Sequence, residues 1–160
     1  MRLERYLIPR TGRASRLGAA KRNPTPDENL GLAQDEVPLS TVCIVVRSNA
    51  LAKNYESQLK HLGLQTRPIS RSEADNPALP GVRIATMHRV KGLQFEHVFL
   101  AGLTQDQVPP QSAASTAADP AAHNAILKAE RCLLHVSATR AKQGVFVTYH
   151  GQPSALLPLR

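Results

Sequence analysis

The sequence predicts an α/β fold with a mostly parallel sheet, on three observations. Short runs rich in β-branched and aliphatic residues recur through residues 41–150, and each has the length of a strand. Most of these runs are apolar at consecutive positions, which is typical of strands covered on both faces. Two stretches with apolar residues at helical spacing, 51–62 and 123–143, alternate with the runs. Such alternation predicts one layered domain.

The first half of this domain begins with TVCIVVRS at 41–48, which indicates a buried strand. Asn49 can cap the helix that follows, and Gly63 stands where a helix would end. LQTRPIS at 64–70 is compatible with a short strand, and the polar, Pro-containing residues 71–81 indicate a loop.

The second half alternates in the same way and closes with a tail. Its expected elements are core strands in VRIATMH (82–88) and EHVFLAGL (96–103), a low-complexity loop at 104–122, a helix at 123–143 ended by Gly144, a strand in VFVTYH (145–150) and a tail at 151–160.

The composition fits a single domain with an aliphatic core. Of 160 residues, 42% are hydrophobic and 4% aromatic, and this length is usual for one domain. No apolar run reaches the roughly 18 residues that span a bilayer, and no secretory signal pattern follows the N-terminus. Cys43 and Cys132 lie far apart in apolar settings, without disulfide or zinc spacing. We therefore expect a cytoplasmic protein with reduced cysteines and no membrane partner.

The positive charge is concentrated near the N-terminus. The chain carries a net charge of +8, of which residues 1–22, with seven basic residues and one acid, carry +6. Residues 23–40 are rich in Pro, Asn and Asp, so residues 1–40 are expected to form a basic, flexible tail and linker. Such a tail can bind a phosphate backbone. It can equally be a solvated leader, and its Arg-rich, acid-poor start also fits an organelle transit peptide.

Basic and polar residues gather at the carboxyl ends of the predicted strands, where parallel α/β sheets bind their ligands. Arg47 lies near the end of one predicted strand, and Thr86 and His88 lie at the end of another. Lys91 and Gly92 come directly after these residues and can approach a phosphate closely, because glycine has no side chain in the way. An ordinary glycine-containing turn is the plainer interpretation of the same residues.

Two long motifs give this edge a more specific meaning. VRIATMHRVKGLQFEHVFLAGL (82–103) resembles the fifth conserved motif of UvrD/Rep/PcrA-type helicases of superfamily 1. ERCLLHVSATRAKQGVFVTYHG (130–151) resembles their sixth motif. VCIVVRSNALAKNYESQLKHLGLQTRPI (42–69) is similar to the strand, helix and strand that open the same domain. The three segments follow the family's order and cover residues 41–150.

The resemblance implies a RecA-like domain of the P-loop NTPase type, with three layers, that serves as the second of two motor domains. In this family ATP and Mg²⁺ lie in the cleft between the motor domains, and the first domain supplies the phosphate loop and the acids that bind Mg²⁺. The second supplies an arginine for the γ-phosphate and part of the grip on single-stranded DNA. The intact enzyme would be an ATP-dependent helicase with 3′-to-5′ polarity.

The resemblance carries over to particular residues. Thr86, His88 and Lys91 match the DNA-contacting positions of the fifth motif, and all three side chains can donate to phosphate oxygens. A capped turn with a histidine at the edge of the core is the structural alternative for the same residues.

The implied ATP-binding residues are Gly92, Gln94 and Arg140. Arg140 matches the catalytic arginine of the sixth motif, which neutralises charge on the transferred phosphoryl group. It can otherwise be an arginine that satisfies carbonyls at a helix end. Gln94 departs from the family, which has Glu in contact with the ribose there; an amide can still form a hydrogen bond but supplies no charge.

The sequence contains no GxxxxGK(S/T) phosphate loop and no DExx pair after a core strand. The insertion usual between the two halves of this family's domain is missing, and residues 72–81 span that point. We therefore expect half of an ATPase site, inactive alone, in a helicase fragment, a truncated product or a stand-alone module. A non-catalytic nucleic-acid-binding or adaptor domain, and an ordinary nucleotide-binding α/β domain with chance motifs, remain the alternatives.

Overall fold

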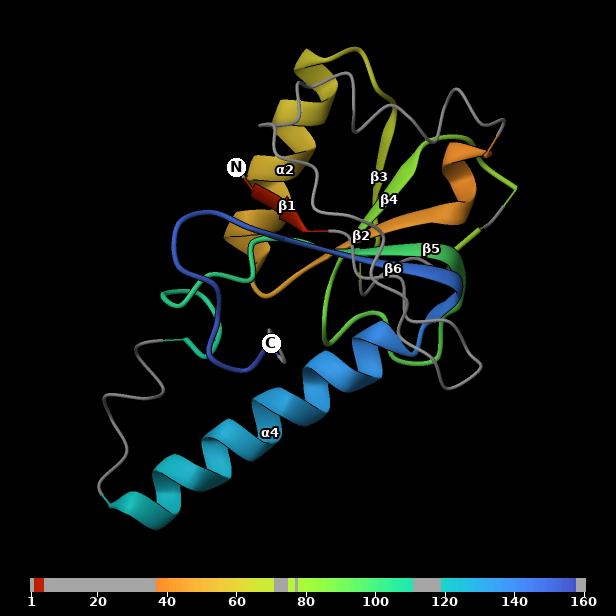
Figure 1. The fold of residues 1–160 in the computed structure, drawn as a ribbon. Coiled ribbons are helices and arrows are strands. Elements are labelled where there is room, and N and C mark those ends of the chain that lie inside the picture. The colour runs from red at the N-terminus through yellow and green to blue at the C-terminus, as the bar shows by residue number, and fades with distance from the viewer. Residues whose placement is uncertain (1, 5–36, 71–74, 77, 111–118, 158–160) are drawn as a thin grey trace.

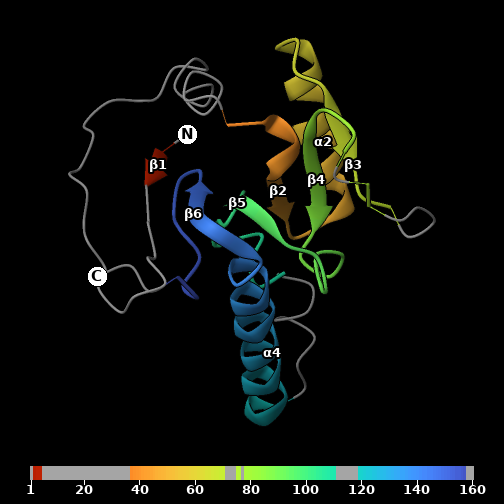
Figure 2. The ribbon, with the colours of Figure 1, turned by 90° about the vertical axis from the view of Figure 1, so that its right-hand side faces the viewer.

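A computed structural model describes residues 2–4, 37–70, 75–76, 78–110 and 119–157. Its centre is a six-stranded sheet in the order β1-β6-β5-β2-β4-β3, drawn in Figures 1 and 2. The strands β2 to β6 run parallel, and β1 pairs antiparallel with β6. The predicted α/β fold with a mostly parallel sheet is confirmed.

The elements are β1 (Arg2–Glu4), η2 (Leu39–Thr41, a 3₁₀ helix), β2 (Val42–Val46), α2 (Asn49–His61), β3 (Thr66–Pro68), β4 (Val82–Thr86), β5 (Phe95–Leu100), α4 (Pro120–Ala138) and β6 (Ala141–Tyr149).

Helices α2 and α4 lie on different sides of the sheet (Figure 1). Cys43 and Val45 of β2 belong to the core cluster that includes Leu134 of α4. Val42 and Val46 are also buried but lie outside that cluster. Since neighbouring residues of a strand point to opposite faces, both faces of the central strand are covered. Helix α2 lies against β2, β3 and β4, whereas α4 contacts β5 and β6.

The core is aliphatic, as predicted, but it also contains a buried ion pair. The Arg83 guanidinium in β4 lies 3.1 Å from the Asp75 carboxylate and 5.3 Å from the centre of the Phe95 ring. Cys43 pairs with Arg83 in the neighbouring strand. Burial raises the pKa of the Cys43 thiol well above its ordinary value, because the thiolate would lose its hydration.

Helix α2 has defined caps at both ends. Ser48, rather than the predicted Asn49, is the N-cap, and its hydroxyl accepts from the Leu51 N–H at 3.3 Å. At the other end Gly63 takes a positive φ of 78°. The N–H groups of Gly63 and Leu64 bond to the carbonyls of Lys60 and Leu59, the pattern of a Schellman motif.

The boundary between α4 and β6 differs from the predicted one. The helix starts earlier, because Asp119 caps it by accepting from Ala122 N–H at 2.6 Å and Pro120 occupies the first turn. It ends at Ala138 rather than near Gln143, and the strand begins at Ala141, which pairs with Phe95. Pairing with β5 therefore overrides the helical pattern of residues 141–143.

Both ends of the described chain contact the sheet. Residues 151–157, expected to be a tail, pack onto the domain: Pro153 bridges to Thr104, and Ser154 is buried. Leu156 and Leu157 pack against the core cluster. Of the predicted N-terminal tail and linker, residues 1 and 5–36 lie outside the described residues. No helix in the described part of the chain is long and apolar enough to span a membrane.

Candidate nucleic-acid and nucleotide site

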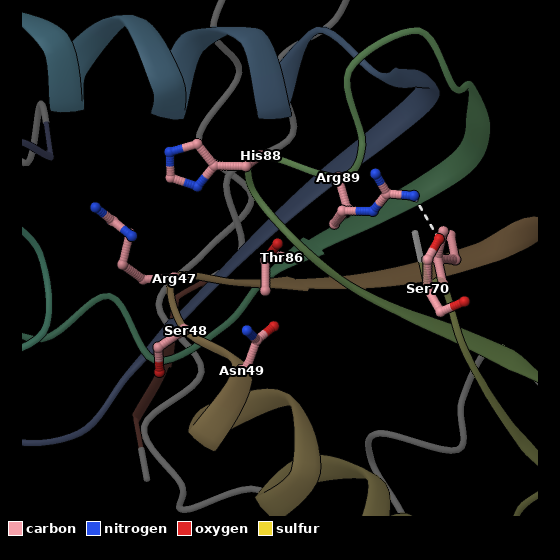
Figure 3. Close-up of a pocket in the computed structure, with 8 residues that line it drawn as sticks. Arg47, Ser48, Asn49, Ser70, Thr86, His88 and Arg89 are labelled. Atoms are coloured by element: carbon pink, nitrogen blue, oxygen red, sulfur yellow. Dashed lines mark hydrogen bonds between the residues drawn. The ribbon is translucent and has the colours of Figure 1, made fainter. Parts of the chain in front are cut away.

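A pocket of about 760 Å³ opens where β2 and β4 end (Figure 3). Seven of its eight lining side chains can donate hydrogen bonds, and none is acidic. Arg47, Thr86 and His88, predicted to share one edge, are therefore brought together. The lining residues are Arg47, Ser48, Asn49, Ile69, Ser70, Thr86, His88 and Arg89.

Arg47 is held at the pocket by a two-point ion pair. Its Nε donates to Glu130 Oε2 at 2.8 Å, and its Nη2 donates to Oε1 at 2.7 Å. Glu130 lies on α4 and is 7% exposed. The pair therefore ties the carboxyl end of β2 to α4, and it leaves the charge of Arg47 compensated within the protein.

His88 projects from a loop whose neighbouring side chains are anchored. Met87 and Val90 are fully buried, whereas His88 between them is exposed. The Arg89 N–H donates to the Thr86 carbonyl at 2.8 Å, which closes a turn at the end of β4. The Arg89 guanidinium turns away from His88 and donates through Nη2 to the Ser70 carbonyl (Figure 3). The loop is thus fixed from both sides, and His88 is presented to solvent.

Lys91 and Gly92 lie outside the pocket lining and form a turn. The Leu93 N–H donates to the Val90 carbonyl at 3.0 Å. Gly92, at the third position of this turn, has φ of 88°, which fits a type II turn. Lys91 and Gly92 are both exposed. The glycine is therefore required by the turn itself, whatever ligand the exposed lysine meets.

Gln94 and Arg140 lie at the other end of the sheet. Each directly precedes a strand, and these two strands, β5 and β6, are parallel neighbours. The Arg140 guanidinium caps α4: its Nε donates to the Val136 carbonyl at 3.1 Å, and its Nη2 to Thr139 Oγ1 at 3.1 Å. In this state the arginine satisfies groups at its own helix end.

The structure adds side chains that the sequence had not nominated. Arg47 was placed on the edge but given no role, and Asn49, Ser70 and Arg89 were not proposed as site residues. The signal for Arg47 and Asn49 was the polar RSN that directly follows a core strand. Glu130 opens the segment that resembles the sixth motif, but its pairing with Arg47 carried no local signal, because the two residues lie 83 positions apart.

No group of three or more His, Cys, Asp or Glu side chains that could hold a metal ion occurs within the described ranges.

A parallel α/β sheet with a donor-rich pocket at its carboxyl edge has the arrangement in which α/β domains bind their ligands. Comparison with known families then identifies the chain, because residues 69–152 match the UvrD-like helicase C-terminal domain. The chain belongs to this family. The predicted resemblance is confirmed, and with it the RecA-like character of the fold.

Relatives with curated descriptions agree with this assignment. The chain is 38% identical over 68 residues to a putative ATP-dependent DNA helicase, YjcD, of Bacillus subtilis, covering 42% of this chain and 9% of that protein. It is 34% identical over 85 residues to the ATP-dependent DNA helicase Rep of Buchnera aphidicola, covering 49% and 12%. It is 31% identical over 98 residues to the ATP-dependent DNA helicase PcrA of Staphylococcus aureus, covering 58% and 12%. The chain thus spans about a tenth of these relatives.

A solved structure shares the fold. It is the C-terminal domain of a possible DNA helicase from Lactobacillus plantarum, with a TM-score of 0.58 and 23% identity, covering 82% of this chain and 68% of that one.

Proposed function

We propose that the chain is the second motor domain of an ATP-dependent 3′-to-5′ DNA helicase. The observation that carries the proposal is the pocket of donor side chains at the carboxyl edge of a UvrD-like domain. Thr86 and His88 line it, and both match positions that the family resemblance connects with DNA. In the proposal these two donors bind the phosphate backbone of single-stranded DNA, and Lys91 adds a mobile positive charge beside them.

The proposal places ATP at the other end of the sheet, against a first motor domain supplied in cis or in trans. Arg140 would release its helix end and donate to the γ-phosphate, because a guanidinium fork matches the charge of the transferred phosphoryl group. Gln94 would bond the ribose, with Gly92 close by. The phosphate loop and the Mg²⁺ ligands are assigned to the first domain, so this chain alone should not hydrolyse ATP.

The DNA part can be tested on the chain itself. A fluorescent single-stranded oligodeoxythymidylate is titrated with the wild type and with Thr86→Val/His88→Ala, which removes both donors while nearly preserving the volume at Thr86. We expect affinity to fall about tenfold or more, since each hydrogen bond to a charged group contributes roughly 1.5–3 kcal/mol. His61→Ala, at the opposite end of α2 from Asn49, is the control and should bind normally. Equal affinity for all three proteins would refute the assignment.

A non-catalytic nucleic-acid-binding domain is the second candidate. It is favoured by Gln94 in place of the family's Glu and by the engagement of Arg140 with its own helix. The motor-domain and adaptor functions predict different outcomes of one experiment. A fusion to a first motor domain with an intact phosphate loop should hydrolyse ATP if the chain is a motor domain and should fail to do so if it is an adaptor.

A further inference from the structure

Arg89 connects the loop that carries His88 to the end of strand β3. Its Nη2 donates to the backbone carbonyl of Ser70, which lies two residues beyond β3. Ile69, the residue before this acceptor, packs against the core cluster. The Ile69 N–H also donates to the Ile84 carbonyl in β4 at 2.8 Å. The acceptor of Arg89 therefore belongs to backbone that is itself anchored to the sheet.

The guanidinium of Arg89 is poorly placed to bind a ligand itself. It turns away from His88 (Figure 3), and its Nη2 is occupied by the Ser70 carbonyl. Its Nε is buried and has no hydrogen-bond acceptor within the described ranges. A buried donor without an acceptor costs free energy, so an apolar side chain of similar length would serve stability about equally well. Stability alone therefore does not account for an arginine at this position.

We propose that Arg89 is a positioning residue, which holds its loop against the end of β3 so that the His88 imidazole can donate to a DNA phosphate at the pocket. The inference rests on the proposed function, because it requires His88 to contact DNA. Arg89 itself does not touch the DNA. It acts by fixing the direction in which its neighbour leaves the backbone.

The contrary possibility is that Arg89 leaves Ser70 and binds a DNA phosphate directly. The salt dependence of binding separates the two roles. Each phosphate that a protein cation neutralises contributes roughly 0.7 to the slope of log affinity against log salt for single strands. If Arg89 positions His88, Arg89→Met weakens binding and leaves this slope unchanged. If Arg89 binds a phosphate, the slope becomes shallower.

The experiment titrates a fluorescent single-stranded oligodeoxythymidylate with the full chain at pH 8 and several salt concentrations. We expect Arg89→Met to weaken binding about tenfold, which corresponds to the loss of one hydrogen bond to a charged group. Its midpoint of urea denaturation should stay close to that of the wild type. Arg89→Lys should restore most of the affinity, because an ammonium group can still donate to the Ser70 carbonyl. The matched control, Arg131→Met, removes the same charge at an exposed position of α4 and should bind nearly as the wild type does.

A double-mutant cycle separates positioning from a general effect on the fold. Arg89→Met should have no further effect on binding when His88 is already Ala, because the residue that it positions is absent. An equal loss in both backgrounds would overturn the proposal, as would a shallower salt slope or an Arg89→Lys variant as weak as Arg89→Met. Should Thr86→Val/His88→Ala weaken binding while Arg89→Met does not, only the positioning role fails. A wild-type chain that does not bind the oligonucleotide would overturn both proposals.

Discussion

The backbone N–H of Phe95 donates to the carbonyl of Arg140 at 2.9 Å. This bond makes Gln94 and Arg140 neighbours at the amino ends of β5 and β6. Thr86 and His88 lie at the carboxyl end of β4, which is the other end of the parallel sheet. Gln94 and Arg140 are thus separated from Thr86 and His88 by the height of the sheet, whereas Lys91 and Gly92 adjoin in the connecting turn.

The role of Arg140 can be tested in a fusion with a first motor domain of a UvrD-like helicase. Arg140→Ala should lower ATP turnover on the order of 10³-fold or more, since it removes a guanidinium that stabilises the transition state. Arg140→Lys should not restore the rate, because a point charge cannot reproduce the fork of donors.

Arg131→Ala is the control for the Arg140 experiment, since Arg131 is exposed on the same helix. The loss of the cap at Val136 should cost only about 1 kcal/mol of unfolding free energy. Near-normal turnover by Arg140→Ala, in a fusion that remains folded, would remove the catalytic assignment.

The Arg47–Glu130 pair should show the stability pattern of a buried salt bridge. Arg47→Met or Glu130→Leu alone should lower the unfolding free energy by roughly 3 kcal/mol, because each leaves an uncompensated charge. The double variant should recover to within about 1 kcal/mol of the wild type, since both charges are then replaced by apolar groups. Urea denaturation gives the unfolding free energies of the wild type, the two single variants and the double variant. Additive losses in the double variant would contradict a coupled pair.

Stability should decline in alkaline solution because of Cys43. An unfolded thiol ionises near its ordinary pKa of 9.0, whereas burial raises the pKa of the folded thiol. Above pH 9 the unfolded state then binds fewer protons than the folded state, and unfolding free energy falls by up to about 1.4 kcal/mol per pH unit. Well below pH 9 the thiol is protonated in both states and contributes no slope. Cys43→Ala should flatten this decline in reducing buffer between pH 9 and 10.5, and an unchanged slope would show another group to be responsible.

Basic residues in the N-terminal region should account for most of the salt dependence of DNA binding. Substituting Gln for the basic residues at 5–22 leaves β1 unchanged and removes six positive charges. The slope of log affinity against log salt should decrease by roughly 0.7 for each DNA phosphate that the protein no longer neutralises. Fluorescence titration of DNA binding at several salt concentrations measures this slope. A slope that does not change would assign the binding to the folded surface around Lys91.

The fold was predictable where local pattern and tertiary pairing agree. The aliphatic run of β2 and the helical spacing of α2, with Gly63 after it, were found from the sequence because capping and burial act on neighbouring residues. The start of α4 was also readable in principle, since Asp119 followed by Pro120 is a strong helix-start signal. The end of α4 was not, because residues 141–143 become a strand only through their pairing with β5.

The candidate site was predictable only in part, for a related reason. Thr86 ends β4 and His88 follows it, so the rule for parallel sheets placed both on the ligand-binding edge, where they do lie with Arg47. The partner of Arg47 could not be found, since Glu130 is brought to it by the packing of α4 rather than by sequence spacing. Nor could the sequence separate Lys91 and Gly92 from the pocket, because the path of the connecting loop decides that.

The connection from β4 to β5 consists of residues 87–94 and is anchored inside by Met87 and Val90. Surface loops ordinarily accept insertions and deletions at little cost. The β4–β5 connection should not accept them. Adding a residue on either side of Val90 would turn a buried side chain outward or shift the turn at Gly92. Length variation that is neutral elsewhere would here displace His88 relative to Gln94. The connection is therefore a poor place for a tag, a domain insertion or a new chain terminus in an engineered version of this domain.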